Sequence, residues 1–538
     1  MKRILLTLSP EQAADKQLIT KAVAREVHLP SQSLYGWHIV KRSIDARQRQ
    51  PKVLLTIDAC LSQEETLIPP YDKPVYQDVS APATPEVNII GMGPAGLFAA
   101  LTLIEHGIRP VIYERGKEVS LRKMDIARLN RNEGLSPESN YCFGEGGAGT
   151  FSDGKLFSRS SKRGNMQRVM ELFHYFGADD TVLYEAHAHI GSDRLPSIIR
   201  RMRETILQHG GQIHFDTCVT ALDLSRPTIL AIGHSAHDTY RLLDKSGIRL
   251  EPKGLAMGVR VEHPQALIDQ IMYHGSPLRA QGLLPAASYS LVTQVHNRFG
   301  QRGVYSFCMC PGGHIVPAAT EAQSIIVNGM SASHRNSPYA NSGIVVELHP
   351  EDLREGCTAI EWLAFQEQLE HLAWLHGADA AGAPLSAIAP AQRLDDFVAG
   401  RPSHDLPKCS YLPGCIPSRL DQWLPPVIGD SLRQGFADFG RKYPGFLTHD
   451  AVILGVESRS SSAIRIPRNP ETMAHPDSPN LYPAGEGAGY AGGITSSALD
   501  GIRVAQALST RLLFRSFRSA GVQELQTNVS TDATLQRR

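Results

Sequence analysis

The chain has 538 residues, more than one hydrophobic core usually serves, so several domains are expected. Its 42% hydrophobic and 20% charged residues are typical of a globular protein and exclude a disordered or fibrous one. The 54 Lys and Arg residues balance the 54 Asp and Glu residues, so no overall field draws the protein to nucleic acid or to an anionic membrane.

The N-terminus carries no pattern of an export signal. Its apolar run stops after about five residues, short of the roughly 7–15 in a signal peptide, and no window approaches the roughly 18 apolar residues of a membrane-spanning helix. We therefore expect a cytoplasmic protein with no membrane partner. Its 8 cysteines are expected to be reduced thiols rather than a disulfide framework.

Residues 1–80 are expected to form a small domain and a linker. The apolar strand RILLTL is followed by the helical pattern DKQLITKAVAREVHL and by two strands, YGWHIVKRSIDA and KVLLTIDA. This order suggests a ferredoxin-like α+β domain. Its excess of Lys and Arg favours an ordinary solvated surface, with an RNA-binding or docking face as the alternative. Residues 61–86 contain five prolines and little periodicity, as an extended linker does.

A glycine-rich loop begins within the stretch NIIGMGPAGLFAALTLIEHG, residues 88–107. Gly91, Gly93 and Gly96 form G-x-G-x-x-G between the strand VNII and a helix. In such a loop the first glycine permits a tight turn, the second lets the backbone approach a pyrophosphate, and the third lets the helix pack on the strand. The helix N-terminus then faces the phosphates with unpaired N–H groups. Glu114 ends the next strand, 23 residues after Gly91, where a carboxylate that accepts ribose hydroxyls is expected. We therefore predict a dinucleotide site.

A second glycine-rich segment, near the other end of the chain, favours FAD over NAD(P). NLYPAGEGAGYAGGITSSALDGIRVAQAL, residues 480–508, contains a short strand, a turn with Glu486 and a second helix start. An NAD(P) domain does not need such a segment, whereas the ribityl chain and ring of FAD extend beyond the pyrophosphate and require further contacts. FAD is therefore the expected cofactor, held jointly by the two segments.

Residues 85–515 resemble the glutathione-reductase-like FAD/NAD(P)-binding superfamily. More narrowly, the chain resembles a bacterial family of FAD-dependent dehydrogenases in which a small N-terminal domain precedes the FAD domain. The resemblance implies a fold and a cofactor but no particular reaction. The blocks that carry it are FGEGGAGTFSDGKL, AMGVRVEHPQ, FCMCPGG, NGMSASHRNSPYANSGIVV, GVESRSSSAIRI and YPAGEGAGYAGGI.

The resemblance also implies a set of FAD contacts. Gly485 and Glu486 stand where the superfamily has a Gly-Asp pair facing the ribityl hydroxyls, and the helix start at residues 493–495 would lie at the pyrimidine edge of the flavin. The strand near Val219 would flank the adenine. The predicted cofactor-binding residues are Gly91, Gly93, Pro94, Ala95, Gly96, Glu114, Arg115, Gly149, Val219, Ala231, Gly233, Gly485, Glu486, Gly493, Ile494 and Thr495.

The expected fold class is α/β. It comprises a Rossmann-like FAD-binding domain, an inserted α+β substrate domain and the small N-terminal ferredoxin-like α+β domain. The predicted boundaries are 1–80 for the N-terminal domain and linker, 85–253 for the first part of the FAD-binding domain, 254–450 for the inserted substrate or cap domain, 451–515 for the C-terminal part of the FAD-binding domain, and 516–538 for a flexible tail.

The loop FGEGGAGTFSDGKL, residues 143–156, is a candidate flavin contact. Its glycines allow it to lie against a flat ring, and in the related superfamily the corresponding stretch lines the isoalloxazine. Lys155 and Glu145 are therefore candidate catalytic residues. A phosphate-binding loop is the alternative, but Leu156 rather than Ser or Thr follows Lys155.

Cys308 and Cys310 in SFCMCPGG suggest redox chemistry, because a thiol near a flavin can form an adduct or pass on electrons. Cys308 is thus a third candidate catalytic residue. The C-x-C spacing places both side chains on one face of a strand and strains a disulfide, which favours buried structural cysteines.

Two further pairs alternate along predicted strands. Glu457 and Arg459 are expected to face the substrate cavity or to pair with each other. His187 and His189 are interpreted as ordinary strand histidines, because no further ligands can be placed beside them. No metal site is expected.

The sequence thus predicts an FAD-dependent oxidoreductase, a dehydrogenase or reductase, that transfers hydride between flavin N5 and an unidentified small organic molecule. No second G-x-G-x-x-G follows a strand, so a dedicated NAD(P) domain is not expected, although NAD(P)H could bind transiently. The alternatives are an RNA-acting flavoprotein guided by the N-terminal domain and a non-catalytic flavin-binding regulator. A nucleic-acid partner is not expected in the favoured interpretation, and the oligomeric state stays open.

Overall fold

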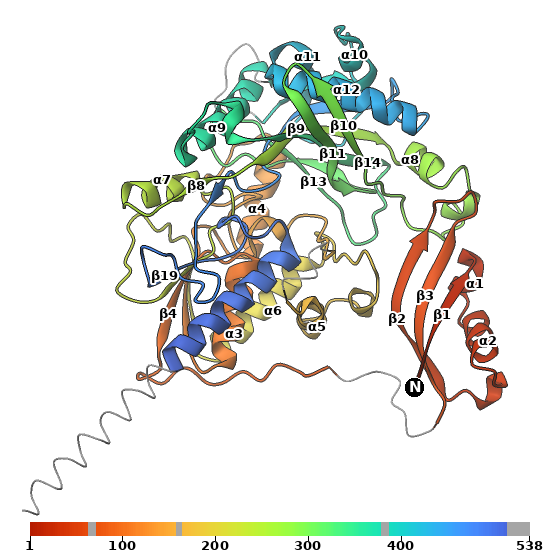
Figure 1. The fold of residues 1–538 in the computed structure, drawn as a ribbon, viewed down its shortest axis with the longest axis horizontal. Helices are drawn as coiled ribbons and strands as arrows, with labels where there is room; N and C mark the ends of the chain where they lie inside the picture. The colour runs from red at the N-terminus through yellow and green to blue at the C-terminus, as the bar shows by residue number, and fades with distance from the viewer. Residues whose placement is uncertain (63–70, 158–163, 378–386, 514–538) are drawn as a thin grey trace, which may run out of the picture.

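A computed structural model describes residues 1–62, 71–157, 164–377 and 387–513. Its three largest sheets lie in three units, which Figure 1 shows at the right, at the lower left and at the top. The predicted tail, 516–538, lies outside the described residues.

The N-terminal unit is an antiparallel sheet in the order β1-β3-β2, with helices beside it. Alternate residues of β1 are buried and pack with Ile19 and Val23 of α2. The predicted order of elements is present, but a ferredoxin-like fold has a further helix and strand that residues 1–62 do not contain. The elements are β1 (Lys2–Leu8), α1 (Pro10–Ala14), α2 (Lys16–Glu26), β2 (Gly36–Asp45) and β3 (Lys52–Cys60).

Strand β2 joins the N-terminal unit to the rest of the chain. The Arg42 N–H donates to Tyr184 O at 2.8 Å, and the Ala186 N–H donates to Arg42 O at 2.9 Å. The Arg42 side chain also lies 3.3 Å from the carboxylate of Glu185. Part of the basic character of this unit is therefore used in docking.

A five-stranded parallel sheet in the order β19-β7-β4-β5-β6 forms the lower unit in Figure 1. Helix α3 (Pro94–Glu105) connects β4 to β5, and its residues 95–104 are all buried. The sheet, α6 (Leu195–Gln208) and a helix over residues 494–513 enclose it. Because β19 lies near the far end of the chain, the two ends of this α/β unit meet in one sheet. The strands are β4 (Glu86–Ile90), β5 (Arg109–Tyr113), β6 (Gln212–His214), β7 (Thr228–Leu230) and β19 (Leu481–Pro483).

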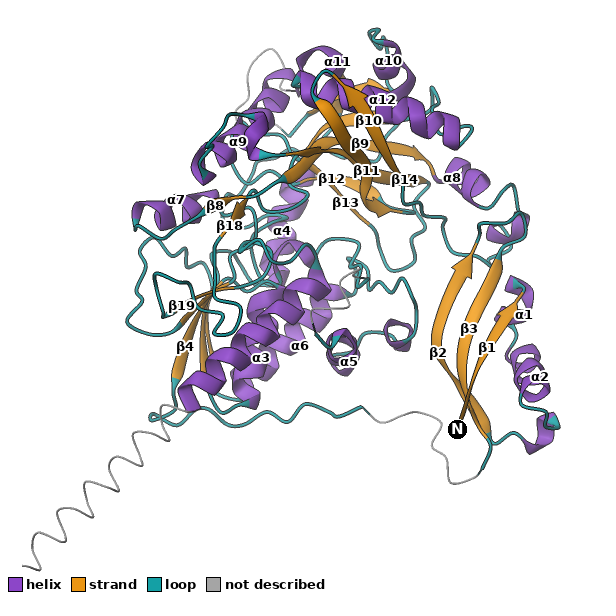
Figure 2. Ribbon diagram, viewed as in Figure 1, coloured by secondary structure: helices purple, strands orange, loops and turns teal. Residues whose placement is uncertain are grey.

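A seven-stranded mixed sheet in the order β10-β11-β14-β9-β17-β15-β16 forms the upper unit, with α9 (Ala359–Gly377) and α12 (Pro426–Lys442) packed against it in Figure 2. Its β17 pairs with both β9 and β15, although it follows residue 450, the predicted end of the inserted domain. The sheet therefore continues into residues that the sequence boundaries assign to the FAD-binding domain. The strands are β9 (Leu255–Pro264), β10 (Val292–Asn297), β11 (Gly300–Cys310), β14 (Tyr339–Leu348), β15 (Ala389–Arg393), β16 (Cys415–Pro417) and β17 (Val452–Glu457).

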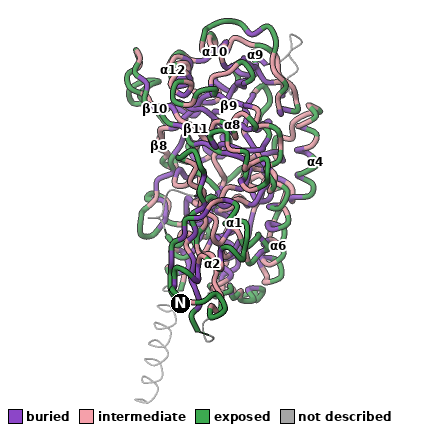
Figure 3. The backbone as a smooth tube through the Cα atoms, turned by 90° about the vertical axis from the view of Figure 1, so that its right-hand side faces the viewer, coloured by how far each residue is buried: buried purple, intermediate pink, exposed green. Residues whose placement is uncertain are grey.

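Buried apolar residues form a large core at each of the three sheets, and the core of the upper unit also includes Leu230 of β7 and Leu481 of β19. In Figure 3 the buried residues lie mostly toward the interior of the molecule, and the exposed ones lie mostly at its margins. No helix among the described residues is both long and apolar enough to cross a membrane. The remaining named elements are α4 (Val119–Asn130), α5 (Met166–Tyr175), α7 (His237–Lys245), β8 (Glu251–Pro252), α8 (Gln265–Met272), β12 (His314–Pro317), β13 (Val327–Met330), α10 (Leu394–Ala399), α11 (Leu420–Trp423), β18 (Ile464–Arg465) and short 3₁₀ turns at Ser31–Ser33, Gly147–Gly149, Asp180–Leu183, Pro277–Arg279 and Pro350–Asp352.

Candidate cofactor site and adjoining cavity

The three glycines between β4 and α3 have different physical reasons to be glycine. A Cβ on Gly91, whose φ is +99°, would lie 2.4 Å from Ala231 O, and one on Gly96 would lie 2.0 Å from Gly91 O. Both are therefore required by the fold itself. A Cβ on Gly93 would meet only Gly147 Cα, at 3.8 Å. The fold does not require glycine at this position, so its absent side chain leaves room for a ligand.

The start of α3 is built to face an anion. Gly93 is the N-cap and provides no side-chain cap, and Pro94 occupies the first helical position. The first N–H groups of the helix therefore carry the positive end of its dipole without a capping oxygen from the N-cap residue. This is the arrangement that binds phosphate groups.

Segments far apart in sequence meet at this helix start. A Cβ on Gly485 would lie 2.7 Å from Ala95 Cβ, and one on Gly487 would lie 2.3 Å from Gly233 O. The Asp500 carboxylate accepts the Gly485 N–H at 2.8 Å and also binds Arg468. The predicted first and last segments of the cofactor site are thus in direct contact.

The loop of residues 143–156 connects this glycine cradle to the interior. A Cβ on Gly147 would lie 2.9 Å from Gly93 Cα, and one on Gly149 would lie 2.8 Å from Ile494 Cγ1. Thr495 Oγ1 donates to Leu156 O at 2.7 Å. The predicted cofactor-binding residues Gly149, Ile494 and Thr495 therefore form one contact region.

Glu145 anchors this loop and does not line the cavity beside it. Its carboxylate is buried, accepts the Val119 N–H at 2.7 Å and lies 3.3 Å from Arg203. Burial raises its pKa. This geometry gives the predicted catalytic role of Glu145 no support, because its oxygens point to the start of α4.

A partly open cavity adjoins the loop. Its wall combines loop residues such as Ala148 and Phe151 with residues from the seven-stranded sheet and the segment after it, including Glu457 and Arg459. The loop therefore touches the glycine cradle on one side and the cavity on the other. The lining residues are Tyr141, Cys142, Ala148, Phe151, Ser152, His234, Val316, Ala318, Ile326, Asn328, Gly329, Glu457 and Arg459.

Two buried ion pairs support this wall. Glu457 accepts from Arg260 Nη1 at 2.7 Å, and Arg459 makes two hydrogen bonds, of 2.9 and 2.8 Å, with Glu370. The prediction that Glu457 and Arg459 face the cavity is consistent with this structure, whereas their pairing with each other is wrong. Each has a partner on another element, because β17 ends at Glu457 and the chain then leaves the strand.

Sequence reasoning missed Arg260, Glu370, Asn328 and His234. Arg260 lies within the apolar strand AMGVRVEH, and Glu370 lies on a largely buried helix. A charge at such a position must find a buried partner, and this is the signal that could have identified both.

Cys308 and Cys310 do not share one strand face, contrary to the prediction. A bulge interrupts the pairing of β11 with β14 between Phe307 and Cys310, and Cys308 has a φ of +44°. Cys308 is exposed, while Cys310 is buried 3.5 Å from Arg260 Nη2. Desolvation of the Cys308 thiol is the largest influence on its pKa and raises it. A raised pKa does not favour a role of Cys308 as a nucleophile.

Lys155 lies close to both Asp153 and Cys310. Its Nζ is 3.7 Å from Asp153 Oδ2 and 3.8 Å from Cys310 Sγ. Burial opposes ionisation of Asp153, but Lys155 and Arg335 together hold its pKa below the usual value. The His189 ring meanwhile contacts Ser333 O, as an ordinary structural histidine would.

Comparison with known proteins now identifies the family. Over 525 residues the chain is 35% identical to a protein of Clostridium beijerinckii named only as an uncharacterized protein, and the match covers 91% of this chain and 96% of that protein. The chain belongs to that protein's family. Residues 254–460 match a family model described as FAD-dependent protein, C-terminal domain-like, and residues 1–60 match a domain of unknown function. FAD is the cofactor, as the sequence predicted.

Solved flavoenzyme structures are similar to this chain at low scores. CtdE with FAD and a substrate has a TM-score of 0.30 and 10% identity, covering 82% of this chain and 88% of CtdE. Tetracycline destructase Tet(51) has a TM-score of 0.31 and 10% identity over 80% of this chain and 84% of its own. Halogenase PltM has a TM-score of 0.33 and 11% identity over 81% and 70%. Scores of this size support no argument about this FAD-dependent protein.

Glu114 is well placed for the ribose of FAD. One carboxylate oxygen accepts the N–H groups of Gly116 and Gly144, and the other accepts the Met92 N–H at 2.8 Å. The second oxygen keeps a lone pair beside the glycine loop, which a hydroxyl group can use. The Thr217 N–H donates to Glu114 O, so the backbone just before Val219 lies beside Glu114.

The remaining predicted FAD contacts fit to different degrees. Ala231 is held by its N–H bond to Ile90 O, and a Cβ on Gly233 or Gly493 would meet open space, as a ligand cradle requires. Glu486 is half-buried with its Oε1 3.5 Å from His234 Nδ1. The Arg115 guanidinium donates hydrogen bonds to Glu138 and Asp238 and lies 4.1 Å from the centre of the Phe143 ring. A side-chain contact from Arg115 to FAD is therefore not supported.

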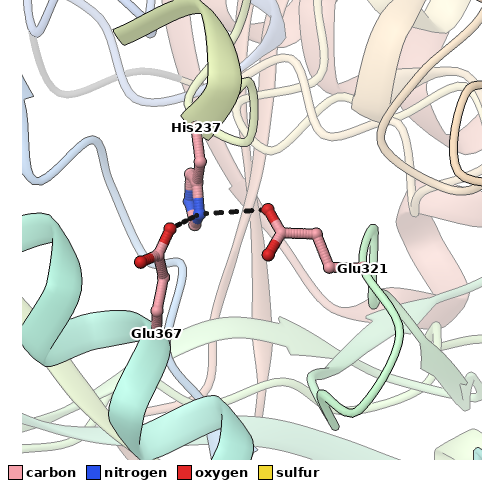
Figure 4. Close-up of side chains that lie close together, drawn as sticks. All are labelled: His237, Glu321 and Glu367. Atoms are coloured by element: carbon pink, nitrogen blue, oxygen red, sulfur yellow. Dashed lines mark hydrogen bonds and ion pairs between the residues drawn. The ribbon is translucent and has the colours of Figure 1, made fainter. Parts of the chain in front are cut away.

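A His-Glu-Glu cluster links the parallel-sheet unit to the upper unit, as Figure 4 shows. His237 Nδ1, at the start of α7, lies 3.0 Å from Glu367 Oε1 on α9 and 3.6 Å from Glu321 Oε1. Arg241 also contacts Glu367 and places a positive charge beside its carboxylate. Desolvation opposes ionisation of Glu367, yet the hydrogen bonds from His237 and Arg241 lower its pKa to about 2. A second group comprises Asp395, Asp396 and His449. The absence of a metal site stays a prediction.

The pKa of Glu262 yields a testable pH dependence. Burial raises it from 4.5 to about 8, although Ser410 donates to it. The folded state thus retains a proton that the unfolded state releases between these two values, so stability falls as pH rises from 4.5 to 8 and does not change from this source below 4.5. Glu262→Gln should remove the penalty, at about 1.4 kcal/mol per pKa unit.

We expect Glu262→Gln to be more stable than wild type in urea unfolding at pH 9, by a few kcal/mol by the same conversion, and the difference to shrink toward pH 5. Glu347→Gln, at a half-exposed glutamate on β14, serves as the control. A difference that stays constant with pH would show that Glu262 is ionised throughout.

Proposed function

We propose that this FAD-dependent protein is an oxidoreductase that acts on a small organic molecule bound in the cavity beside the loop of residues 143–156. One observation carries the proposal. The loop of residues 143–156 contacts Gly93 and Ile494 through its glycines and lines the cavity through Ala148 and Phe151. Cofactor cradle and cavity thus share a wall, as a flavin site and a substrate site must.

FAD, when bound, supplies hydride transfer at its flavin ring. The chain supplies binding, orientation and proton handling. Gly91, Gly93 and the start of α3 would hold the diphosphate, Glu114 the ribose, and Glu486 the ribityl chain. The contact of Thr495 Oγ1 with Leu156 O fixes the second helix start against the loop.

Glu457 is the residue best suited to hold a proton for the bound molecule. It lines the cavity, and burial raises its pKa while Arg260 opposes the rise. A carboxyl group whose pKa is raised above the usual value is better suited to hold and release a proton during a reaction. The side chain of Lys155 lies near Asp153 and Cys310. We assign Lys155 a positioning role in this proposal.

The finer assignment is a dehydrogenase or reductase of the glutathione-reductase-like superfamily, with transient use of NAD(P)H. The parallel sheet with its first and last glycine-rich segments in contact supports the superfamily. The RNA-acting alternative is not favoured, because Arg3, Arg42 and Arg47 of the N-terminal unit are paired with carboxylates.

Anaerobic rapid mixing tests the proposal. We expect the FAD-loaded protein to lose its flavin absorbance when mixed with NADH, NADPH or a member of a panel of small alcohols, amines and hydroxy acids. Glu457→Gln should slow this bleaching by at least about 100-fold while FAD content stays at the wild-type level, because the proton carrier is lost and the cradle is not.

Glu361→Gln, at an exposed glutamate on α9, is the matched control and should bleach at the wild-type rate. Dithionite should bleach every variant. The proposal fails if dithionite alone reduces the bound flavin, and the role of Glu457 fails if its variant matches the control.

A further inference from the structure

Two cysteines face each other across a short loop before β16. Cys409 Sγ lies 3.4 Å from Cys415 Sγ. Between them the chain turns back, with the Gly414 N–H donating to Tyr411 O at 3.3 Å and Gly414 at a φ of +101°. The turn brings the two ends of the loop together, so the proximity of the thiols follows from the backbone path.

The loop is anchored on both sides of the thiol pair. Ser410 donates through its N–H to Glu262 at 2.7 Å, and its Oγ accepts the Ile315 N–H at 2.8 Å. Cys415 is the first residue of β16 and pairs with Ala389 of β15. A disulfide has an S–S bond of about 2.0 Å, so the two sulfurs need to approach by little more than 1 Å.

The two thiols are chemically distinct. The hydrogen bond with Cys415 lowers the pKa of Cys409 and raises that of Cys415. Both are half-buried, with exposed Lys408 and Leu412 as neighbours, so a small reagent can reach them. By contrast, burial raises the pKa of the thiol of Cys218, which is also half-buried. Cys409 is therefore the better nucleophile at neutral pH.

We propose that Cys409 and Cys415 form a redox-active dithiol site that reacts with small-molecule disulfides such as oxidised glutathione. The Cys409 thiolate attacks one sulfur of the disulfide, and one thiolate of the reagent leaves, which gives a mixed disulfide on Cys409. Cys415 loses its proton to solvent and attacks Cys409 Sγ, and the second thiolate leaves. Two protein thiols are thus oxidised to one disulfide while the reagent is reduced to two thiols.

Thiol trapping on the full FAD-loaded chain tests this site. Reduced protein is incubated with oxidised glutathione, quenched with N-ethylmaleimide and analysed by peptide mass spectrometry. We expect Cys409 and Cys415 to be lost from the maleimide-labelled pool together and to appear as a linked peptide. Cys415→Ser should accumulate glutathione on Cys409. Cys409→Ser should slow oxidation of Cys415 by at least about 10-fold, because the lower-pKa attacking thiol is gone.

Cys218→Ser is the matched control, because it removes a half-buried thiol and leaves the pair intact, so it should not change the rate of linkage. Far-UV circular dichroism and FAD content report folding of each variant. The proposal is overturned if Cys409 reacts no faster than Cys218, or if folded Cys415→Ser collects no mixed disulfide. Because the readout is thiol labelling, failure here is distinguishable from failure of the proposed flavin reaction.

Discussion

Gly93→Ala should produce a normally folded protein that binds FAD at least about 10-fold more weakly than wild type, a loss of about 1.4 kcal/mol. A methyl group here contacts only Gly147 Cα at 3.8 Å in the chain itself. It would, however, stand at the N-cap of α3, where the diphosphate must approach the backbone closely. Titration of the FAD-free protein with FAD, followed by quenching of flavin fluorescence, measures the change.

Gly429→Ala is the matched control, since this glycine lies within α12 and its added methyl group meets Leu424 at ordinary contact distances. It should leave the Kd for FAD unchanged. The thermal transitions of the two FAD-free variants should both lie near that of the wild type. Equal FAD affinity in Gly93→Ala and wild type would place the diphosphate elsewhere.

Arg260→Met should lower the free energy of unfolding by about 3–5 kcal/mol, because it leaves a buried carboxylate without its partner. Arg260 has no exposed surface and donates to Glu457 at 2.7 Å, to Asn341 Oδ1 at 2.8 Å and to Cys308 O at 2.8 Å. It therefore joins β9, β11, β14 and β17 in the middle of the seven-stranded sheet. Urea unfolding followed by circular dichroism measures the loss.

Arg354→Met provides the comparison, because its partner Glu361 is as exposed as Arg354 itself. Exposed pairs contribute only about 0–1 kcal/mol, so this variant should unfold near the wild-type midpoint. Adding Glu457→Gln to Arg260→Met should recover part of the loss, because the remaining buried group is then neutral. Similar losses in Arg260→Met and Arg354→Met would contradict a buried charge pair.

The glycine loop could be predicted because its signals are contiguous. A strand, three spaced glycines, a helix and a second strand that ends at Glu114 all lie within residues 86–114. Turn geometry and close helix packing act over a few residues, so the sequence alone carries them. The second glycine-rich segment, with Glu486 and the helix after it, repeats the same local pattern, and its contacts with FAD stay a prediction.

The errors fall where local pattern and long-range packing diverge. Alternation along a strand predicted that Cys308 and Cys310 share a face, but a bulge against β14 turns Cys308 outward. The catalytic role of Glu145 stays a prediction, and its carboxylate contacts Val119 and Arg203, which come from other parts of the chain. The ferredoxin-like prediction rested on the order strand, helix, strand, strand, whereas that fold also needs a second helix and a fourth strand.

By itself, the sequence determined the glycine-rich turn after β4, the choice of FAD and the alternation of strands and helices, because backbone propensity and glycine stereochemistry act between near neighbours. Only the tertiary structure decided which partner each buried charge takes, that β17 completes the upper sheet, and that Cys409 meets Cys415. Those outcomes depend on contacts between segments hundreds of residues apart or on the exact path of one loop, and a one-residue shift in either would replace one partner with another.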